Sequence, residues 1–184
     1  MSSNPHSGQA FHELILGGAR SGKSRLAERL VQVSGWPVTY IATATVKDDD
    51  EMAGRIRHHQ ARRPDHWGLV EAPLGLAGAL QQHAAANQCL LVDCLTLWLT
   101  NLLLCEDERR LEQEKAALLE TLPLLPGRIV LVSNEVGQGI VPMGALSRRF
   151  VDEAGWLHQA LAERCHRVIF TIAGLPQVLK GPPL

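Results

Sequence analysis

The residues best suited to chemistry in this chain form a glycine-rich loop that ends in lysine and serine. The loop reads Gly17-Gly18-Ala19-Arg20-Ser21-Gly22-Lys23-Ser24 and fits the pattern G-x-x-x-x-G-K-[ST]. An apolar run, 14–16, directly precedes it, and a helix-like segment, 25–31, directly follows it. Strand, loop and helix in this order are the context in which the pattern binds phosphate. The sequence therefore predicts a nucleotide-phosphate site at this loop.

The residue types of the loop explain how it would hold an anion. We expect Gly17, Gly18 and Gly22 to take positive φ, so that successive backbone N–H groups turn inward as donors. The phosphate would then lie at a helix N-terminus, where unpaired N–H groups and the helix dipole favour negative charge. Lys23 would reach the β and γ phosphates, and the Ser24 hydroxyl would bind Mg2+.

An acidic residue is predicted to complete this site where the apolar run 89–92 ends in Asp93. A phosphate-loop protein holds the water shell of its Mg2+ with a carboxylate at the end of a neighbouring strand. The other interpretation is that Asp93 caps the helix that begins near Leu95, since Asp favours helix N-termini. The two roles are compatible, so Ser24 and Asp93 are the predicted metal ligands.

A histidine-rich helix is predicted over 50–63, with acidic residues at its start and a proline directly after it. Arg55, His59 and Arg63 fall at i, i+4 and i+8, so one face carries an imidazole between two guanidinium groups. His58 lies on another stripe, about 100° away. An imidazole can attack phosphorus to form a covalent intermediate, and arginines would neutralise charge on the transferred group. A merely solvated helix face is the alternative.

Strand-like and helix-like segments alternate along the chain, which predicts a parallel sheet with helices on both faces. The expected strands are 13–16, 38–42, 68–71, 89–93, 128–133 and 167–172, and the expected helices are 24–34, 50–63, 75–85, 96–104, 106–122 and 146–164. The predicted fold class is α/β, a mostly parallel, doubly wound sheet. We expect one catalytic domain over 13–180, a flexible leader over 1–12 and a loose tail over 181–184.

The composition argues against several other classes of protein. The chain has 184 residues, 46% of them hydrophobic and 20% charged, as in an ordinary globular domain. A formal net charge of -1 gives no electrostatic case for binding nucleic acid or an anionic membrane. The longest apolar stretch, 89–105, contains polar residues and falls short of a membrane span. The four cysteines form no C-x-x-C pair, which favours buried thiols in a reducing cytoplasm.

Four motifs, taken in order, give the chain a resemblance to one enzyme family. They are the glycine loop, then Tyr40-Ile41-Ala42-Thr43-Ala44, then Glu51-Met52 with Arg55-Ile56 and His59, and then Ser133-Asn134-Glu135-Val136-Gly137-Gln138-Gly139-Ile140-Val141-Pro142. Through this series the chain, from Leu14 to Lys180, resembles the bifunctional adenosylcobinamide kinase / adenosylcobinamide-phosphate guanylyltransferase family of cobalamin biosynthesis.

The resemblance implies two reactions, a RecA-like phosphate-loop fold and a homo-oligomer, expected to be a trimer. ATP or GTP would phosphorylate the aminopropanol hydroxyl of adenosylcobinamide. GMP from GTP would then pass through a covalent histidine adduct to that phosphate, giving adenosyl-GDP-cobinamide and pyrophosphate. The implied nucleophile is His59, with the adjacent His58 as the alternative. Besides the glycine loop, the implied guanine-nucleotide residues are Thr43, Ala44, Gln60, Ala61, Arg62, Arg63, Glu71 and Asp93.

Two rival interpretations belong to other classes of protein. A monofunctional small-metabolite kinase would need the loop, Asp93 and an arginine clamp but no histidine adduct. A GTP-binding switch would signal through the ordering of its loops, although the chain lacks an Asn-Lys-x-Asp guanine signature.

Two further positions have both a functional and a structural interpretation. Glu71 could accept hydrogen bonds from guanine or ribose, or be a solvated carboxylate. The segment 134–137 lies where open α/β sheets bind ligands, or forms a structural turn.

Overall fold

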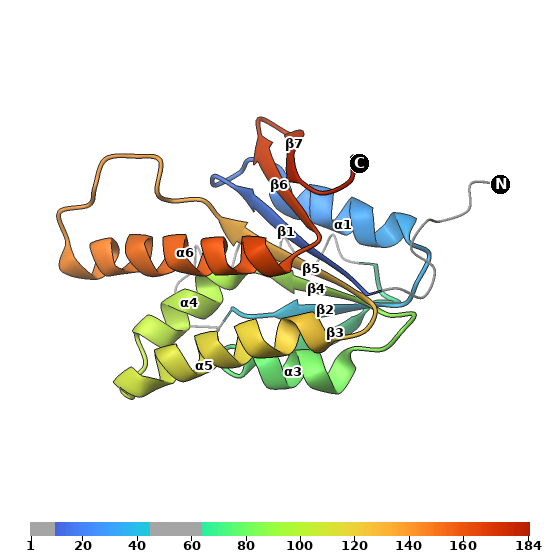
Figure 1. The fold of residues 1–184 in the computed structure, drawn as a ribbon, viewed down its shortest axis with the longest axis horizontal. Coiled ribbons are helices and arrows are strands. Elements are labelled where there is room, and N and C mark those ends of the chain that lie inside the picture. Colours follow the sequence, from blue (N-terminus) through green and yellow to red (C-terminus); the bar gives the residue numbers. More distant parts are fainter. Residues whose placement is uncertain (1–9, 45–63) are drawn as a thin grey trace.

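One sheet of seven strands runs through the part of the chain that the structure, a computed structural model, describes, namely residues 10–44 and 64–184 (Figure 1). The strands lie in the order β3-β2-β4-β5-β1-β6-β7, and every neighbouring pair is parallel except β6 and β7. They are β1 (Phe11–Gly17), β2 (Val38–Ala42), β3 (Gly68–Glu71), β4 (Cys89–Asp93), β5 (Arg128–Asn134), β6 (Arg167–Ile172) and β7 (Leu175–Lys180).

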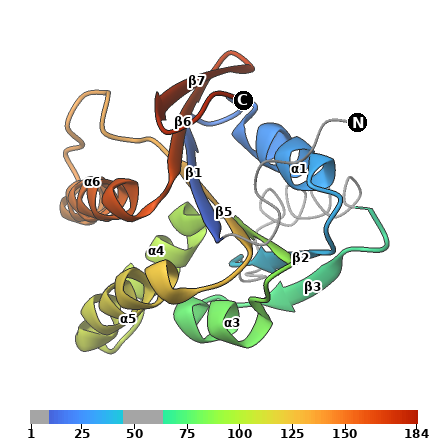
Figure 2. The same cartoon turned by 45° about the vertical axis from the view of Figure 1, so that its right-hand side comes forward.

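Helices cover both faces of this sheet (Figures 1 and 2). On one face lies α1 (Lys23–Val33); on the other lie α3 (Leu76–His83), α4 (Leu95–Leu103), α5 (Glu108–Thr121) with the short 3-10 turn η1 (Leu122–Leu124), and α6 (Ala145–Arg164). The predicted class, a doubly wound and mostly parallel α/β sheet, is confirmed. The predicted helix 50–63 lies outside the described residues. Among the described helices, none has the length and apolar character that crossing a membrane requires.

Two apolar cores form because side chains along a strand point alternately to opposite faces. In β1, Leu14 and Leu16 belong to the core beneath α3 to α6, where Trp98 is fully buried. Ile15, between them, packs in the second core with Leu26 of α1. Both faces of the sheet are therefore buried, which explains why its strands are continuous apolar runs in the sequence.

Residues of β7 were not predicted to form a strand, and the local sequence explains why. The turn between β6 and β7 is made by Ala173 and Gly174, with φ of 51° and 79°. Both residues have positive φ, a hairpin geometry that usually selects Asn-Gly rather than Ala-Gly. Pro176, inside β7, also argues against a strand, but β7 is the edge of the sheet, where proline is tolerated.

The amino-terminal end of the sheet is held together by a buried cluster of charges. The carboxylate of Glu13, which is fully buried, accepts hydrogen bonds from Arg167 Nε at 2.8 Å and from Arg128 Nε at 2.6 Å. Arg167 also donates to the carbonyl oxygen of Pro183 at 2.9 Å, in the segment predicted to be a loose tail. β1 begins at Phe11, two residues before the predicted start, so residues 11 and 12 lie in the sheet rather than before it.

Candidate active site

The glycine loop joins the end of β1 to the start of α1, as predicted from the sequence. Its backbone conformation differs from the prediction, because only Gly22 (φ 95°) and the non-glycine Arg20 (φ 57°) have positive φ. Gly17 is needed for space instead: a Cβ there would lie 2.5 Å from Ser21 Oγ and 2.5 Å from the carbonyl oxygen of Thr171. Gly18 has neither constraint, since a Cβ at this position would meet no atom within 4 Å.

The turn of the β6–β7 hairpin packs against this loop, a contact that sequence reasoning missed. The backbone N–H of Gly174 donates to the carbonyl oxygen of Ser21 at 2.8 Å. A Cβ on Gly22 would lie 3.1 Å from the Cα of Gly174. The hydroxyls of Ser21 and Thr171 are buried close by, without a hydrogen-bond partner in the described part of the chain. The loop is thus supported from one side by residues far along the sequence.

Lys23 is buried at the start of α1 and lies over the loop. Its Nζ donates to the carbonyl oxygen of Gly18 at 3.0 Å. Burial lowers the pKa of Lys23, and the negative charge of Asp93 opposes that effect. Lys23 therefore lies close enough to Asp93 for the carboxylate charge to raise the pKa of the lysine. A phosphate site with a nearby carboxylate requires this arrangement.

Asp93 ends β4, but β4 is not the neighbour of the loop strand that the sequence reasoning assumed. β5 lies between β1 and β4 and pairs with both. The alternative role as a helix cap is also not found, since the N-cap residue of α4 is Cys94. The peptide bond between Asp93 and Cys94 is cis. The thiol of Cys94 is free, like the other three thiols, and burial raises its pKa to about 11.

Thr43 and Asn101 fix the end of β2 to the residue after Asp93. The Thr43 hydroxyl donates to the Cys94 carbonyl oxygen at 2.7 Å and accepts from the Cys94 N–H at 3.0 Å. Asn101 Nδ2 donates to the Thr43 carbonyl oxygen at 2.8 Å. The side chain of Thr43 is fully buried, so its hydroxyl acts within the protein.

The predicted site residues that the structure describes gather at the carboxyl end of the sheet. Ala42 is in register with Glu71 on one side and with Asp93 on the other, and Thr43 and Ala44 follow directly. Glu71 is exposed. The remaining predicted residues, His59, Gln60, Ala61, Arg62 and Arg63, lie outside the described residues, as does the alternative His58.

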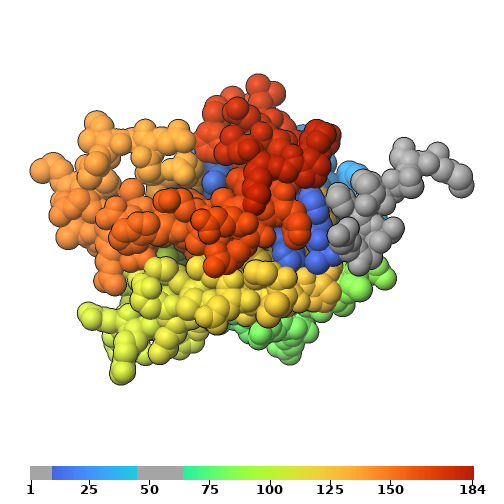
Figure 3. Space-filling view, in the orientation of Figure 1, coloured from blue at the N-terminus to red at the C-terminus, as the bar shows by residue number. Residues whose placement is uncertain are grey.

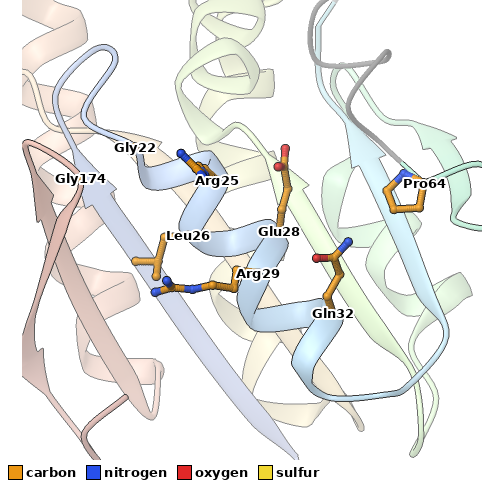
Figure 4. A pocket seen from close by; sticks show the side chains of 8 residues that line it. All are labelled: Gly22, Arg25, Leu26, Glu28, Arg29, Gln32, Pro64 and Gly174. Atoms are coloured by element: carbon orange, nitrogen blue, oxygen red, sulfur yellow. The ribbon is translucent and has the colours of Figure 1, made fainter.

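A pocket of about 510 Å³ runs along the outer side of α1 (Figure 4). Gly22 and Gly174 lie at one end, next to the glycine loop, and Pro64 lies across the pocket from α1 (Figure 4). From α1 it is lined by Arg25, Leu26, Glu28, Arg29 and Gln32. The described chain thus resumes, at Pro64, beside a cavity that begins at the loop.

The loop, its buried lysine and a carboxylate two strands away define a phosphate-loop fold of the RecA-like class. The fold is similar to that of the flagellar accessory protein FlaH from Methanocaldococcus jannaschii, with a TM-score of 0.51 over 95% of this chain and 79% of that chain, at 15% identity. At this identity the likeness concerns the fold alone.

The particular family follows from the sequence comparisons. The family model for cobinamide kinase / cobinamide phosphate guanyltransferase matches residues 13–179. The chain is 68% identical over 174 residues to the bifunctional adenosylcobalamin biosynthesis protein CobP of Pseudomonas aeruginosa, which covers 95% of this chain and 100% of that protein. It is 40% identical over 180 residues to CobU of Escherichia coli, covering 91% and 98%. The chain belongs to the cobinamide kinase / cobinamide phosphate guanyltransferase family, which confirms the resemblance of its motifs.

Proposed function

We propose that this protein catalyses both reactions of its family. It phosphorylates the aminopropanol hydroxyl of adenosylcobinamide with ATP or GTP, and then transfers GMP from GTP to that phosphate, releasing pyrophosphate and adenosyl-GDP-cobinamide. One observation carries the proposal: Lys23 is buried over the glycine loop, and the charge of Asp93 affects its pKa. The family model matches this chain over 13–179.

In the first reaction the loop binds and orients the triphosphate. Lys23 exchanges the carbonyl oxygen of Gly18 for an oxygen of the β or γ phosphate, which costs little because the lysine is already held above the loop. Ser24 and Asp93 offer a hydroxyl and a carboxylate, the oxygen donors that suit Mg2+. Mg2+, when bound there, neutralises charge on the phosphates.

In the second reaction His59 is the nucleophile. A ring nitrogen of the neutral imidazole bonds to the α-phosphorus of GTP, the bond from that phosphorus to the bridging oxygen breaks, and pyrophosphate leaves. A phosphate oxygen of the cobinamide phosphate then attacks the same phosphorus, and the P–N bond breaks. An unperturbed imidazole, with a pKa of about 6.5, is mostly neutral at cytoplasmic pH, where we place the enzyme.

Two observations support the placement of His59 near the triphosphate. Ala44, the last described residue before the segment 45–63, follows β2 at the carboxyl end of the sheet. Pro64, the first described residue after that segment, lines the same pocket as Gly22 of the loop. For the guanine nucleotide we propose Gln60, Ala61, Arg62, Arg63 and Glu71, with Thr43 and Ala44 acting through backbone groups because the Thr43 hydroxyl is already paired.

We also propose that copies of the chain associate, as a trimer, through the segment between β5 and α6. This segment stands out from one side of the molecule (Figure 3). It exposes Ile140, Val141 and Met143, with 98%, 72% and 96% of their surfaces accessible. Apolar side chains exposed together are typical of an interface. Light scattering after size exclusion should give the mass of three chains; a monomer at all concentrations would contradict the proposal.

Labelled GTP tests the function against its rivals. With label at the α-phosphate, we expect the protein to retain stable label and to pass it to cobinamide phosphate. With label at the γ-phosphate, we expect transfer to cobinamide. Transfer of the γ-label alone would support a monofunctional kinase. Retention of GTP with neither transfer would support the switch and overturn the proposal.

A further inference from the structure

The carboxyl end of β5 is held by a network of hydrogen bonds that the proposed chemistry does not use. The N–H of Asn134 donates to Thr96 Oγ1, on α4, at 2.7 Å. The hydroxyl of Ser133 lies 3.5 Å from that of Thr96 and 2.7 Å from Nε2 of His158, on α6. Two helices therefore fix the last two residues of this strand.

His158 occupies the centre of this network. Its side chain is buried, and Nδ1 lies 3.8 Å from Oε2 of Glu135. The other oxygen of Glu135 accepts the backbone N–H of Gly137, at 2.5 Å. Burial lowers the pKa of His158, against the opposite effect of Glu135. The ring lies between Ser133, to which it is hydrogen-bonded, and Glu135, and these two residues flank Asn134.

Asn134 lies between the two parts of the phosphate site, the glycine loop and Asp93. Asn134 is in register with Gly17 on β1, and the N–H of Glu135 donates to the Gly17 carbonyl oxygen at 3.1 Å. β5 itself separates β1 from β4, the strand that ends in Asp93. The end of β5 is thus placed between the loop and the carboxylate.

Alternation along β5 decides which side chain faces the nucleotide. Val132 packs in the core beneath α1, and Ser133 contacts α4 and α6 on the opposite face. Asn134 therefore returns to the face of α1, the helix that begins with Lys23. Asn134 is half-buried, and in the described part of the chain its backbone N–H is hydrogen-bonded while its side-chain amide is not. An amide donor is thus left free on the side where the triphosphate binds.

We propose that Asn134 is a further catalytic residue of the phosphoryl transfer, donating its amide N–H to an oxygen of the γ-phosphate, and that His158 is the positioning residue that keeps it there. The inference rests on the proposed function and adds two residues to it. An amide aimed at an oxygen that gains charge in the transition state speeds the chemical step more than it tightens binding.

The test separates the rate of the kinase reaction from the binding of its nucleotide. Asn134→Ala should lower kcat by on the order of 100-fold, while the KM for the nucleotide changes little. His158→Leu should lower kcat by about tenfold through misplacement of Asn134. His158→Gln, whose amide can still reach Ser133, should recover most of that loss. Gln159→Ala, the exposed neighbour on α6, is the control and should leave kcat unchanged.

The outcomes distinguish this inference from the function on which it rests. A wild-type protein without cobinamide kinase activity would overturn the proposed function. An active wild type with an unchanged kcat in Asn134→Ala would overturn the inference alone, as would equal losses in His158→Leu and His158→Gln. If His158→Leu does not fold, as judged by circular dichroism, Ser133→Ala takes its place: a fall in kcat at constant KM supports the positioning role, and an unchanged kcat refutes it.

Discussion

Gly17 packs directly against the backbone of Thr171, so closely that a Cβ at position 17 would lie 2.5 Å from the Thr171 carbonyl oxygen. This contact joins the first residue of the phosphate loop to the strand on the other side of β1 from β5. The loop is therefore shaped as much by β6 as by its own glycines.

Gly17→Ala should accordingly weaken GTP binding, because either the loop or β6 must shift to admit the methyl group. Overpacking of this kind costs on the order of 1–3 kcal/mol, so we expect a loss of affinity of about tenfold or more. Gly18→Ala is the matched control, since its Cβ meets no atom within 4 Å. Calorimetric titration with GTP measures both; equal affinities for the two variants would show that the contact has no role in the loop's shape.

His59→Ala should abolish the covalent GMP adduct and leave the cobinamide kinase step measurable, because in the proposed mechanism only the second reaction uses the imidazole. Mass spectrometry of the protein after incubation with GTP detects the adduct. His58→Ala is the control on the neighbouring residue and should retain it. An adduct that persists in His59→Ala and disappears in His58→Ala would reverse the assignment.

Glu13→Gln should destabilise the protein by about 3 kcal/mol, because it leaves two guanidinium groups beside a buried neutral amide. The effect on GTP affinity should be small, since Glu13 lies toward the amino-terminal end of the sheet, away from the loop. Glu112→Gln is the control for an exposed carboxylate in an ion pair, with Lys115 at 3.0 Å and 69% of the Glu112 side chain accessible. It should cost less than about 1 kcal/mol. Urea unfolding decides the matter, and similar losses in both variants would contradict the prediction.

Acid should weaken the fold through His12, which is buried and whose pKa burial lowers from 6.5 to about 4. Between these two pKa values the unfolded chain binds a proton that the folded chain does not. The free energy of unfolding therefore falls as the pH drops through this window, by about 3 kcal/mol in total.

His12→Gln separates this contribution from the rest of the titration. The ring nitrogen Nε2 of His12 lies 3.1 Å from the Leu125 carbonyl oxygen, and a glutamine amide can donate to the same oxygen without titrating. Urea unfolding at pH 7 and pH 5 should show a smaller loss of stability in His12→Gln than in the wild type. His66→Gln, at an exposed position, is the control. Equal pH dependence in His12→Gln and wild type would refute the assignment.

Local patterns predicted the loop, six strands and the class of fold, because each depends on residues that are close in sequence. The Lys23 side chain, the start of α1 and the apolar run that ends in Asp93 are of this kind. Strand order is different: no local pattern reports that β5 enters between β1 and β4, since pairing is decided by the packing of the whole sheet.

The parts of the site that escaped prediction are long-range contacts. Gly174 is hydrogen-bonded to Ser21, and His158 to Ser133. These partners are far apart in the sequence, so no pattern of residue spacing predicts their contact. The positive φ of Arg20 escaped too, because an L-residue rarely takes it unless its surroundings impose it. Thr43 was implied as a nucleotide-binding residue by the family resemblance, and that role stays a prediction. The structure shows that its hydroxyl pairs with the backbone of Cys94.

The contact of the β6–β7 turn with the glycine loop also bears on biosynthesis. The ribosome synthesises residues 17–24 early and residues 171–174 much later. For most of translation the glycine loop therefore lacks the residues that pack against it in the folded protein. Competence to hold a nucleotide should consequently arise late, when that distant hairpin closes.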